Sequence, residues 1–187
     1  GISCEIHDNT NITLRKINVY SSRYHGFYCM RNKGTVLFED VNIKRAPYDQ
    51  NLKYLSWGDV WHMTNNRAKI ILKNCKAEMY IYDDVFNFHT STMYVAEKHS
   101  NTEITLQANN KYYGVPEILP GDTITIIDVN SGALVGRPTV KKVVEQKEQS
   151  VRVILNISMP SLKAGSKIYA WDEEANGHPD SELINCD

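Results

Sequence analysis

The chain has 187 residues, a formal net charge of −1 and 42% hydrophobic residues. This length allows one domain or two small ones, and the composition supplies enough apolar side chains for a core. The nearly neutral charge argues against a nucleic-acid partner, because nucleic-acid-binding domains are usually basic. No apolar run is as long as a membrane span, so we expect no membrane partner either.

The ends and the cysteines give two further expectations. The chain begins at Gly1 and shows no signal peptide, which indicates a processed or expressed piece of a longer protein. None of the cysteines forms a C-x-x-C pair, and their low density favours buried thiols over a disulfide framework. They are Cys4, Cys29, Cys75 and Cys186.

One spacing pattern of apolar residues recurs three times in the first half of the chain. Between Ile12 and Val19, apolar residues follow one another at steps of two, three and two. The same steps recur from Val36 to Ile43 and from Ile70 to Ala77. A step of two keeps one face of a strand, and a step of three adds a corner residue before that face resumes.

A second series of inward pairs begins at Phe27, Trp61 and Phe86. Trp61 and Phe86 are 25 residues apart, and the first two copies of the spacing pattern are 24 apart. Short strands, sharp corners and a unit of this length are typical of a parallel β-helix. A β-sandwich also produces such spacings, but three copies in register favour the β-helix. The interval from Val36 to Ile70 is ten residues longer than the first, which predicts an inserted loop around 45–57.

Polar residues alternate with the inward pairs and are predicted to share one outward face. If the turns of the chain stack in register, at about 4.8 Å, this face forms a groove wall. One outward column then reads Ser3, Tyr28, His62, Asn87, and the next reads Glu5, Met30, Thr64, His89.

The period is lost after residue 100, where short strands alternate with separate turns. This pattern predicts a small antiparallel β-barrel. The expected strands are Glu103–Leu106, Thr123–Val129, Thr139–Glu145, Val151–Ser158 and Lys167–Trp171. The spacing of two and three returns at Ser181, Leu183 and Cys186. We therefore expect β-helix coils at 1–99, a β-barrel insertion at 100–175 and the start of a further coil at 176–187.

Three motifs stand in an order that resembles glycoside hydrolase family 110, the exo-acting α-1,3-galactosidases. They are Gly58-Asp59 with His62, then Ile71 to Cys75, then Asp83-Asp84-Val85-Phe86-Asn87-Phe88-His89. The resemblance implies a right-handed β-helix with small β-barrel insertions. It also implies hydrolysis of a terminal α-galactosyl residue with inversion. The partner would be a galactose-containing oligosaccharide or polysaccharide, met outside the cell or in the periplasm. Later coils of the family are missing here, so we expect this chain alone to hydrolyse poorly.

The carboxylates of Asp59 and Asp84, with Asp83 as a possible substitute, are the candidate catalytic groups. Inverting glycosidases place an acid and a base about 6.5–9.5 Å apart. Two carboxylates close together disfavour each other's ionisation, which would keep one protonated as the acid. The alternative is that these residues only turn corners, where aspartate is favoured.

The candidate substrate-binding residues lie on or near the same face. They are His62, Asn87, His89, Tyr28, His25 and Trp57. Simpler roles stay open: surface histidines, an asparagine ladder between turns, a histidine at a corner, and a loop aromatic that packs on its own loop.

Metal and cofactor binding have little support, because no fixed ligand spacing is present. Two other functions stay open on the same scaffold. A polysaccharide lyase needs a Lys or Arg base beside a cation, and the outward columns offer neither. A non-catalytic carbohydrate-binding or structural β-helix needs no acid–base pair at all.

Overall fold

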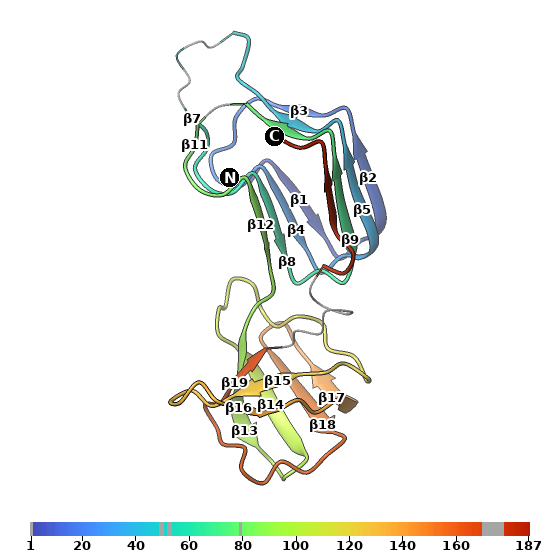
Figure 1. Ribbon diagram of the computed structural model, residues 1–187, viewed down its shortest axis with the longest axis vertical. Coiled ribbons are helices and arrows are strands. Elements are labelled where there is room, and N and C mark those ends of the chain that lie inside the picture. Colours follow the sequence, from blue (N-terminus) through green and yellow to red (C-terminus); the bar gives the residue numbers. More distant parts are fainter. Residues whose placement is uncertain (1, 49–50, 52–53, 79, 170–177) are drawn as a thin grey trace. The chain divides into compact units, whose positions relative to one another are not determined.

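The computed structural model describes residues 2–48, 51, 54–78, 80–169 and 178–187 (Figure 1). Every regular secondary-structure element in the described part of the chain is a β-strand, so this part holds no helix that could cross a membrane. The all-β prediction is therefore confirmed for these residues. The chain divides into two compact units, Gly1–His89 with His178–Asp187 and then Thr90–Gly177.

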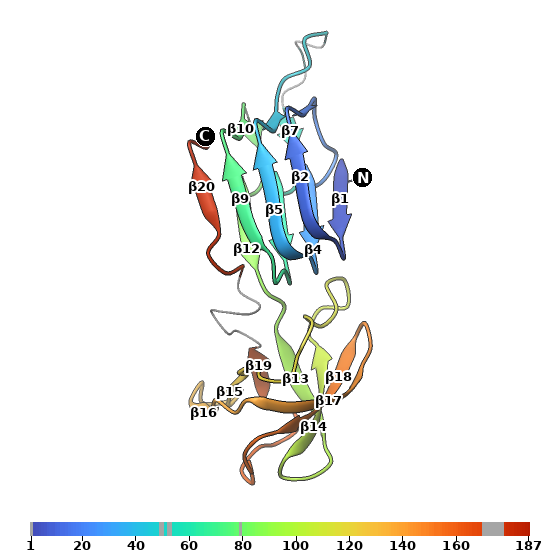
Figure 2. The ribbon, with the colours of Figure 1, turned by 90° about the vertical axis from the view of Figure 1, so that its right-hand side faces the viewer.

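The first unit consists of parallel sheets that the chain visits in turn (Figure 1). The first sheet has the order β1 (Cys4–His7), β4 (Phe27–Met30), β8 (Trp61–Thr64), β12 (Phe86–His89). The second has the order β2 (Thr10–Arg15), β5 (Lys33–Glu39), β9 (Lys69–Lys73), β20 (Glu182–Ile184). One short sheet contains β3 (Asn18–Val19), β6 (Asn42–Ile43) and β10 (Lys76–Ala77). Another pairs β7 (Tyr54–Ser56) with β11 (Tyr80–Ile81). Figure 2 shows the strands of the second sheet side by side, with β20 at its edge.

Residues with a left-handed backbone make the corners that the spacing predicts. The step of three contains Lys16, Asp40, Asn74 and Asn185 on successive turns, each with φ between 50° and 55°. Asparagine and aspartate tolerate this region better than most residues. One left-handed residue thus turns the chain between two short strands, and the inward face resumes on the other side.

The register of the later turns agrees with the sequence prediction, and that of the first turn does not. Tyr28 pairs with His62, and His62 with Asn87, as expected. However, Glu5 rather than Ser3 pairs with Tyr28. The first turn is therefore shifted by two residues. This preserves the inward face, because a two-residue shift does not change which side a side chain faces.

The inward face forms the core of the first unit, as predicted. Trp61 and Phe27 are fully buried with rings 6.0 Å apart, and Phe86 stacks on Trp61 at 5.1 Å. The opposite face is not the open wall that the sequence suggests, because His62, Tyr28 and their neighbours on β4 and β8 are buried too. Adjacent turns bring the rings of that face into contact, which excludes water from between them.

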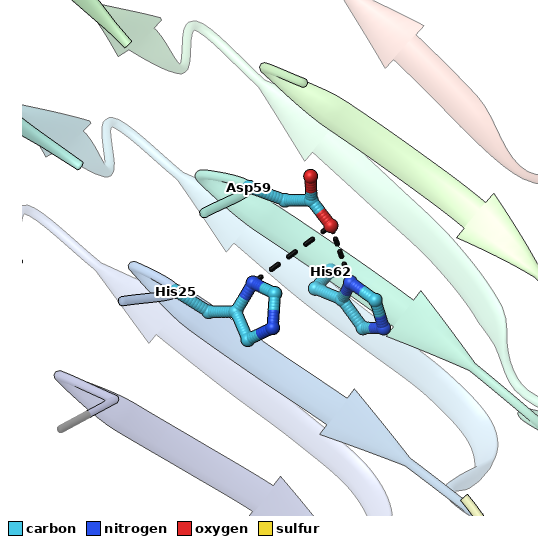
Figure 3. A group of neighbouring side chains, drawn as sticks. All are labelled: His25, Asp59 and His62. Carbon is cyan, nitrogen blue, oxygen red and sulfur yellow. Dashed lines mark hydrogen bonds and ion pairs between the residues drawn. The ribbon is translucent and has the colours of Figure 1, made fainter. Parts of the chain in front are cut away.

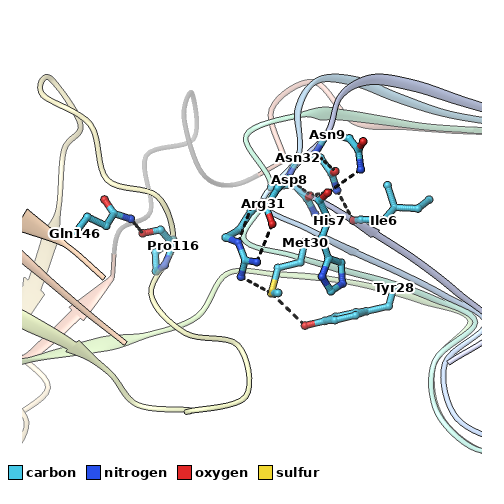
Figure 4. Close-up of polar contacts among 11 residues, drawn as sticks. Ile6, His7, Asp8, Asn9, Tyr28, Met30, Arg31, Asn32, Pro116 and Gln146 are labelled. Atoms are coloured by element: carbon cyan, nitrogen blue, oxygen red, sulfur yellow. Dashed lines mark hydrogen bonds and ion pairs between the residues drawn. The ribbon is translucent and has the colours of Figure 1, made fainter. Parts of the chain in front are cut away.

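A buried asparagine ladder ties successive turns together at the end of the first sheet (Figure 4). Asn32 accepts a hydrogen bond from the backbone N–H of Asn9 at 3.0 Å and donates to the Ile6 carbonyl at 2.9 Å. Its own N–H donates to Asn66 Oδ1 at 3.0 Å. These bonds satisfy backbone groups at the corners that the short strands leave unpaired.

The second unit is one antiparallel sheet with its own apolar core, and the β-barrel insertion expected at 100–175 stays a prediction. Its strands, in sheet order, are β16 (Leu134–Gly136), β15 (Thr125–Ile127), β19 (Lys167–Tyr169), β13 (Met93–Lys98), β14 (Glu103–Ala108), β18 (Ser150–Leu155) and β17 (Val140–Gln146). An isolated antiparallel bridge joins Thr123, in the segment before β15, to Thr139, the residue before β17. The end of the expected strand Lys167–Trp171 lies outside the described residues. The expected domain boundaries at 99/100 and 175/176 stay predictions.

All four cysteines are free thiols, and Cys29 and Cys75 are buried. Burial raises the pKa of Cys75 to about 11 and raises that of Cys29 further. The Cys75 thiol lies near the Phe38 carbonyl of the preceding turn, with 3.6 Å from sulfur to oxygen. Cys29 and Cys75 are thus part of the core, as predicted, whereas Cys4 and Cys186 are only half-buried and pack against it.

Candidate active site

The candidate site lies where the chain enters β4, β8 and β12. Extending the strand pairing back by two residues places His25, Asp59 and Asp84 at equivalent positions on successive turns. Backbone hydrogen bonds continue through this corner: Gly26 donates to the Asp59 carbonyl and Val60 to the Asp84 carbonyl, each at 3.0 Å. The corner is therefore held by the same hydrogen-bond ladder as the sheet.

The carboxylate of Asp59 is the centre of this corner and is only 2% exposed. His62 Nδ1 donates to its Oδ2 (Figure 3), and Asn87 Nδ2 donates to the same oxygen at 3.0 Å. The backbone N–H of Asp84 donates to the other oxygen, Oδ1, at 3.2 Å. Three donors around one carboxylate satisfy a group that only accepts hydrogen bonds. This arrangement fixes both the position and the orientation of the Asp59 side chain.

A second histidine faces the same carboxylate oxygen. His25 Nδ1 lies 3.7 Å from Asp59 Oδ2, and this buried nitrogen makes no hydrogen bond among the described residues (Figure 3). The imidazole ring of His25 lies 4.3 Å from that of His62. Burial and the charge of His62 lower the pKa of His25, against the opposing effect of Asp59. His25 is thus held neutral beside the carboxylate.

A chain of hydrogen bonds leads from Asp59 through two histidines. His62 Nε2 lies 3.0 Å from His89 Nε2, and His89 Nδ1 lies 3.5 Å from the Thr64 hydroxyl. One of these two Nε2 atoms donates to the other, and the tautomers of the two rings decide which one. Burial, together with His62 and His178, lowers the pKa of His89 to about 4. His89 is therefore neutral at pH 7, with one ring nitrogen that donates and one that accepts.

Asp83 and Asp84 are exposed, in contrast to Asp59. One carboxylate oxygen of each lies within 4.8 Å of an oxygen of Asp59 and of the other. The structure thus brings the three candidate acids together. These oxygens are at most 4.8 Å apart, which is less than the roughly 6.5–9.5 Å between the carboxyl groups of inverting glycosidases and less than the about 5–5.5 Å of retaining ones.

The other two candidate residues have different surroundings. Tyr28 is 2% exposed, its hydroxyl donates to Met30 Sδ at 3.3 Å, and its ring lies 5.1 Å from His62. Tyr28 is therefore a packing partner of the histidines. Trp57 is 57% exposed and stacks on Tyr82, with 5.4 Å between ring centroids.

Two groups of side chains in the described residues are arranged so that each could hold a metal ion. The first is His25, Asp59 and His62, and the second is Asp59, Asp83 and Asp84. Ligand atoms within each group lie within 4.8 Å of one another. In the first group the hydrogen bond between His62 and Asp59 would have to open before a cation could bind between them.

His178 also belongs to this cluster, and sequence reasoning did not find it. Its Nε2 donates to the backbone carbonyl of His89 at 3.1 Å, and its ring lies 5.4 Å from Phe88. The second unit separates His178 from β12 in the sequence, so no spacing pattern connects the two. The only available signal was the position of His178 just before the segment where the period returns.

Comparison with known proteins gives one distant relationship. No family model matches the chain. The chain is 26% identical over 153 residues to "Alpha-1,3-galactosidase A" of Akkermansia muciniphila, in an alignment that covers 78% of this chain. The alignment covers 25% of that protein, so the chain spans about a quarter of its length. Membership of glycoside hydrolase family 110 stays a prediction, and this distant similarity supports a galactosidase-like relationship.

Proposed function

We propose that this chain carries part of the active site of a glycoside hydrolase that removes terminal α-1,3-linked galactose from glycans with inversion. As parts of the same proposal, the stacked parallel sheets of the first unit are a right-handed parallel β-helix of family 110, and the enzyme works outside the cell or in the periplasm. The observation that carries the proposal is the convergence of Asp59, Asp83 and Asp84 at one corner. The similarity to an α-1,3-galactosidase supports it independently.

In this mechanism the exposed carboxyl groups of Asp83 and Asp84 meet the substrate. One donates a proton to the glycosidic oxygen as the galactosyl bond breaks. The other takes a proton from the water that attacks the anomeric carbon from the opposite face. Asp59, held by three donors, supplies a fixed negative charge beside the water and the developing positive charge on the sugar.

The short separation of the carboxylates sets one requirement on this mechanism. An inverting enzyme needs room for a water molecule and a sugar between acid and base. Exposed aspartates change χ1 rotamer readily, and such a change displaces the carboxylate by several ångströms. We therefore propose that substrate binding separates the exposed carboxylates.

The test is the stereochemistry of hydrolysis. The full-length enzyme is mixed with a terminal α-1,3-galactoside, and proton NMR follows the first galactose released. Inversion predicts that β-galactose appears first and then mutarotates. Initial release of α-galactose would show retention, in agreement with the short separation seen here, and would overturn the inverting mechanism.

The second candidate function is carbohydrate binding without catalysis. The observation that favours it is the same short separation, because an acid–base pair at this spacing leaves no room for the attacking water. Binding of a galactoside without release of galactose, by the folded full-length protein, would select this function.

A further inference from the structure

We propose that Trp57 and Tyr82 form one aromatic platform that stacks against a pyranose ring of the glycan, beside the three carboxylates. This subsite rests on the proposed function for the identity of its ligand, a galactose-containing glycan. Its geometry rests on separate observations. The two residues precede Trp61 and Phe86 by four positions each, and those strands pair with Trp61 opposite Phe86. The rings thus stand on successive turns of the chain.

The rings form a single surface that water reaches. Their centroids are 5.4 Å apart and their planes meet at 30°, which is a stacked arrangement. Trp57 is 57% exposed and Tyr82 is 68% exposed. Exposed large aromatic side chains on an ordered turn are typical of binding surfaces, because their burial by a ligand is strongly favourable.

Backbone hydrogen bonds fix the platform relative to the carboxylates. Tyr82 immediately precedes Asp83, and Trp57 lies two residues before Asp59. Tyr82 N–H donates to the Ser56 carbonyl at 3.0 Å, and the Asp84 N–H donates to the Asp59 side chain at 3.2 Å. These bonds lie on either side of Asp83 and join the two turns. A sugar on the rings therefore lies at a defined position beside the acids, which is the positioning that catalysis requires.

The aromatic rings of Trp57 and Tyr82 favour a sugar that has an apolar face. A galactopyranose has an axial hydroxyl at C4, so the hydrogens of C3, C4 and C5 gather on one face and make it apolar. That face can lie on an aromatic ring while the hydroxyls at the ring edge point toward carboxylates. Aromatic walls with a few polar groups at the rim are the usual composition of such sites.

The test measures binding, so it does not depend on hydrolysis. Saturation-transfer NMR and a fluorescence titration follow the binding of methyl α-galactoside and of galactosyl-α-1,3-galactose to the chain. We expect Trp57→Ala and Tyr82→Ala to weaken binding about tenfold. Tyr82→Phe, which keeps the ring and loses the hydroxyl, should bind like the wild type. Tyr112→Ala is the matched control, because Tyr112 is a tyrosine of the second unit with 56% exposure.

The outcomes separate this inference from the proposed function. If the sugars bind and the alanine variants bind as well as the wild type, the platform is overturned, whatever the hydrolysis assay shows. If binding weakens in the alanine variants and the full-length wild-type enzyme releases no galactose, the platform stands and the hydrolase proposal fails. If neither sugar binds to a folded wild-type chain, the platform is overturned as well. Circular dichroism of each variant establishes that it is folded.

Discussion

Replacing Asp59 by asparagine tests whether the buried carboxylate organises the corner. Its Oδ2 accepts from His62 and Asn87, and its Oδ1 accepts from the backbone N–H of Asp84. In the better orientation the new amide keeps an oxygen at the Oδ2 position, and its NH₂ group faces the Asp84 N–H. One buried donor then loses its acceptor, which costs about 2 kcal/mol. The opposite orientation loses two acceptors and is worse.

The matched control is Asp84→Asn, which makes the same chemical change at an exposed side chain and keeps its backbone donor. We expect this variant to lie within about 0.5 kcal/mol of the wild type. Urea denaturation followed by tryptophan fluorescence, in a Trp171→Phe background, reports on the first unit, because the two remaining tryptophans, Trp57 and Trp61, belong to it. Equal midpoints for Asp59→Asn and Asp84→Asn would refute the reasoning, because the carboxylate of Asp59 would then make no specific contribution.

Three further predictions concern catalysis, pH and the fold. In the full-length enzyme, Asp83→Asn and Asp84→Asn should each lower kcat for a terminal α-1,3-galactoside about 10²-fold or more, because an amide is neither acid nor base; unchanged rates exclude the mechanism. The lowered pKa of His89, about 4, means that the unfolded chain protonates first, at its ordinary pKa of about 6.5. The stabilisation that neutral His89 provides above pH ~6.5 is thus lost as the pH falls toward ~4. Over this pH range the urea midpoint of His89→Gln should therefore fall less than that of the wild type. Asn32→Ala leaves two backbone groups without partners and should cost about 3 kcal/mol in urea denaturation. The control is Asn9→Ala, which removes an exposed side-chain amide. Water can replace its hydrogen bond to the His7 carbonyl, so the urea midpoint should hardly move.

The sequence predicts the inward face of the first unit well, for a physical reason. A strand has a side-chain period of two, and a left-handed corner such as Asn74 adds one residue without changing the face. The spacing of apolar residues therefore reports directly on the core. The second unit is also predictable as antiparallel, because its turns and alternating strands are local features.

The parts that sequence reasoning missed depend on contacts across long separations. The shift of the first turn by two residues leaves every inward side chain inward, so hydrophobic spacing cannot detect it. The burial of His62 and Tyr28 depends on the stacking of rings from different turns, which no single strand shows. His178 reaches the site only because the chain returns after the second unit.

The stacked arrangement also distinguishes Asp83 from Asp84 by their distance from Asp59, the fixed charge of the proposed mechanism. Asp84 and Asp59 occupy the same position on adjacent turns, so their backbones are only ~4.8 Å apart. Asp83 lies one residue earlier in the chain, and the diagonal of ~4.8 Å and ~3.3 Å gives a backbone separation from Asp59 of roughly 5.8 Å. The longer diagonal leaves more room beside Asp83 for the glycosidic oxygen, so we assign the acid to Asp83 and the base to Asp84. If the roles divide in this way, Asp83→Asn should affect substrates with poor leaving groups far more than those with good ones, because only poor leaving groups need the acid. An equal loss on both kinds of substrate would assign the acid to another residue.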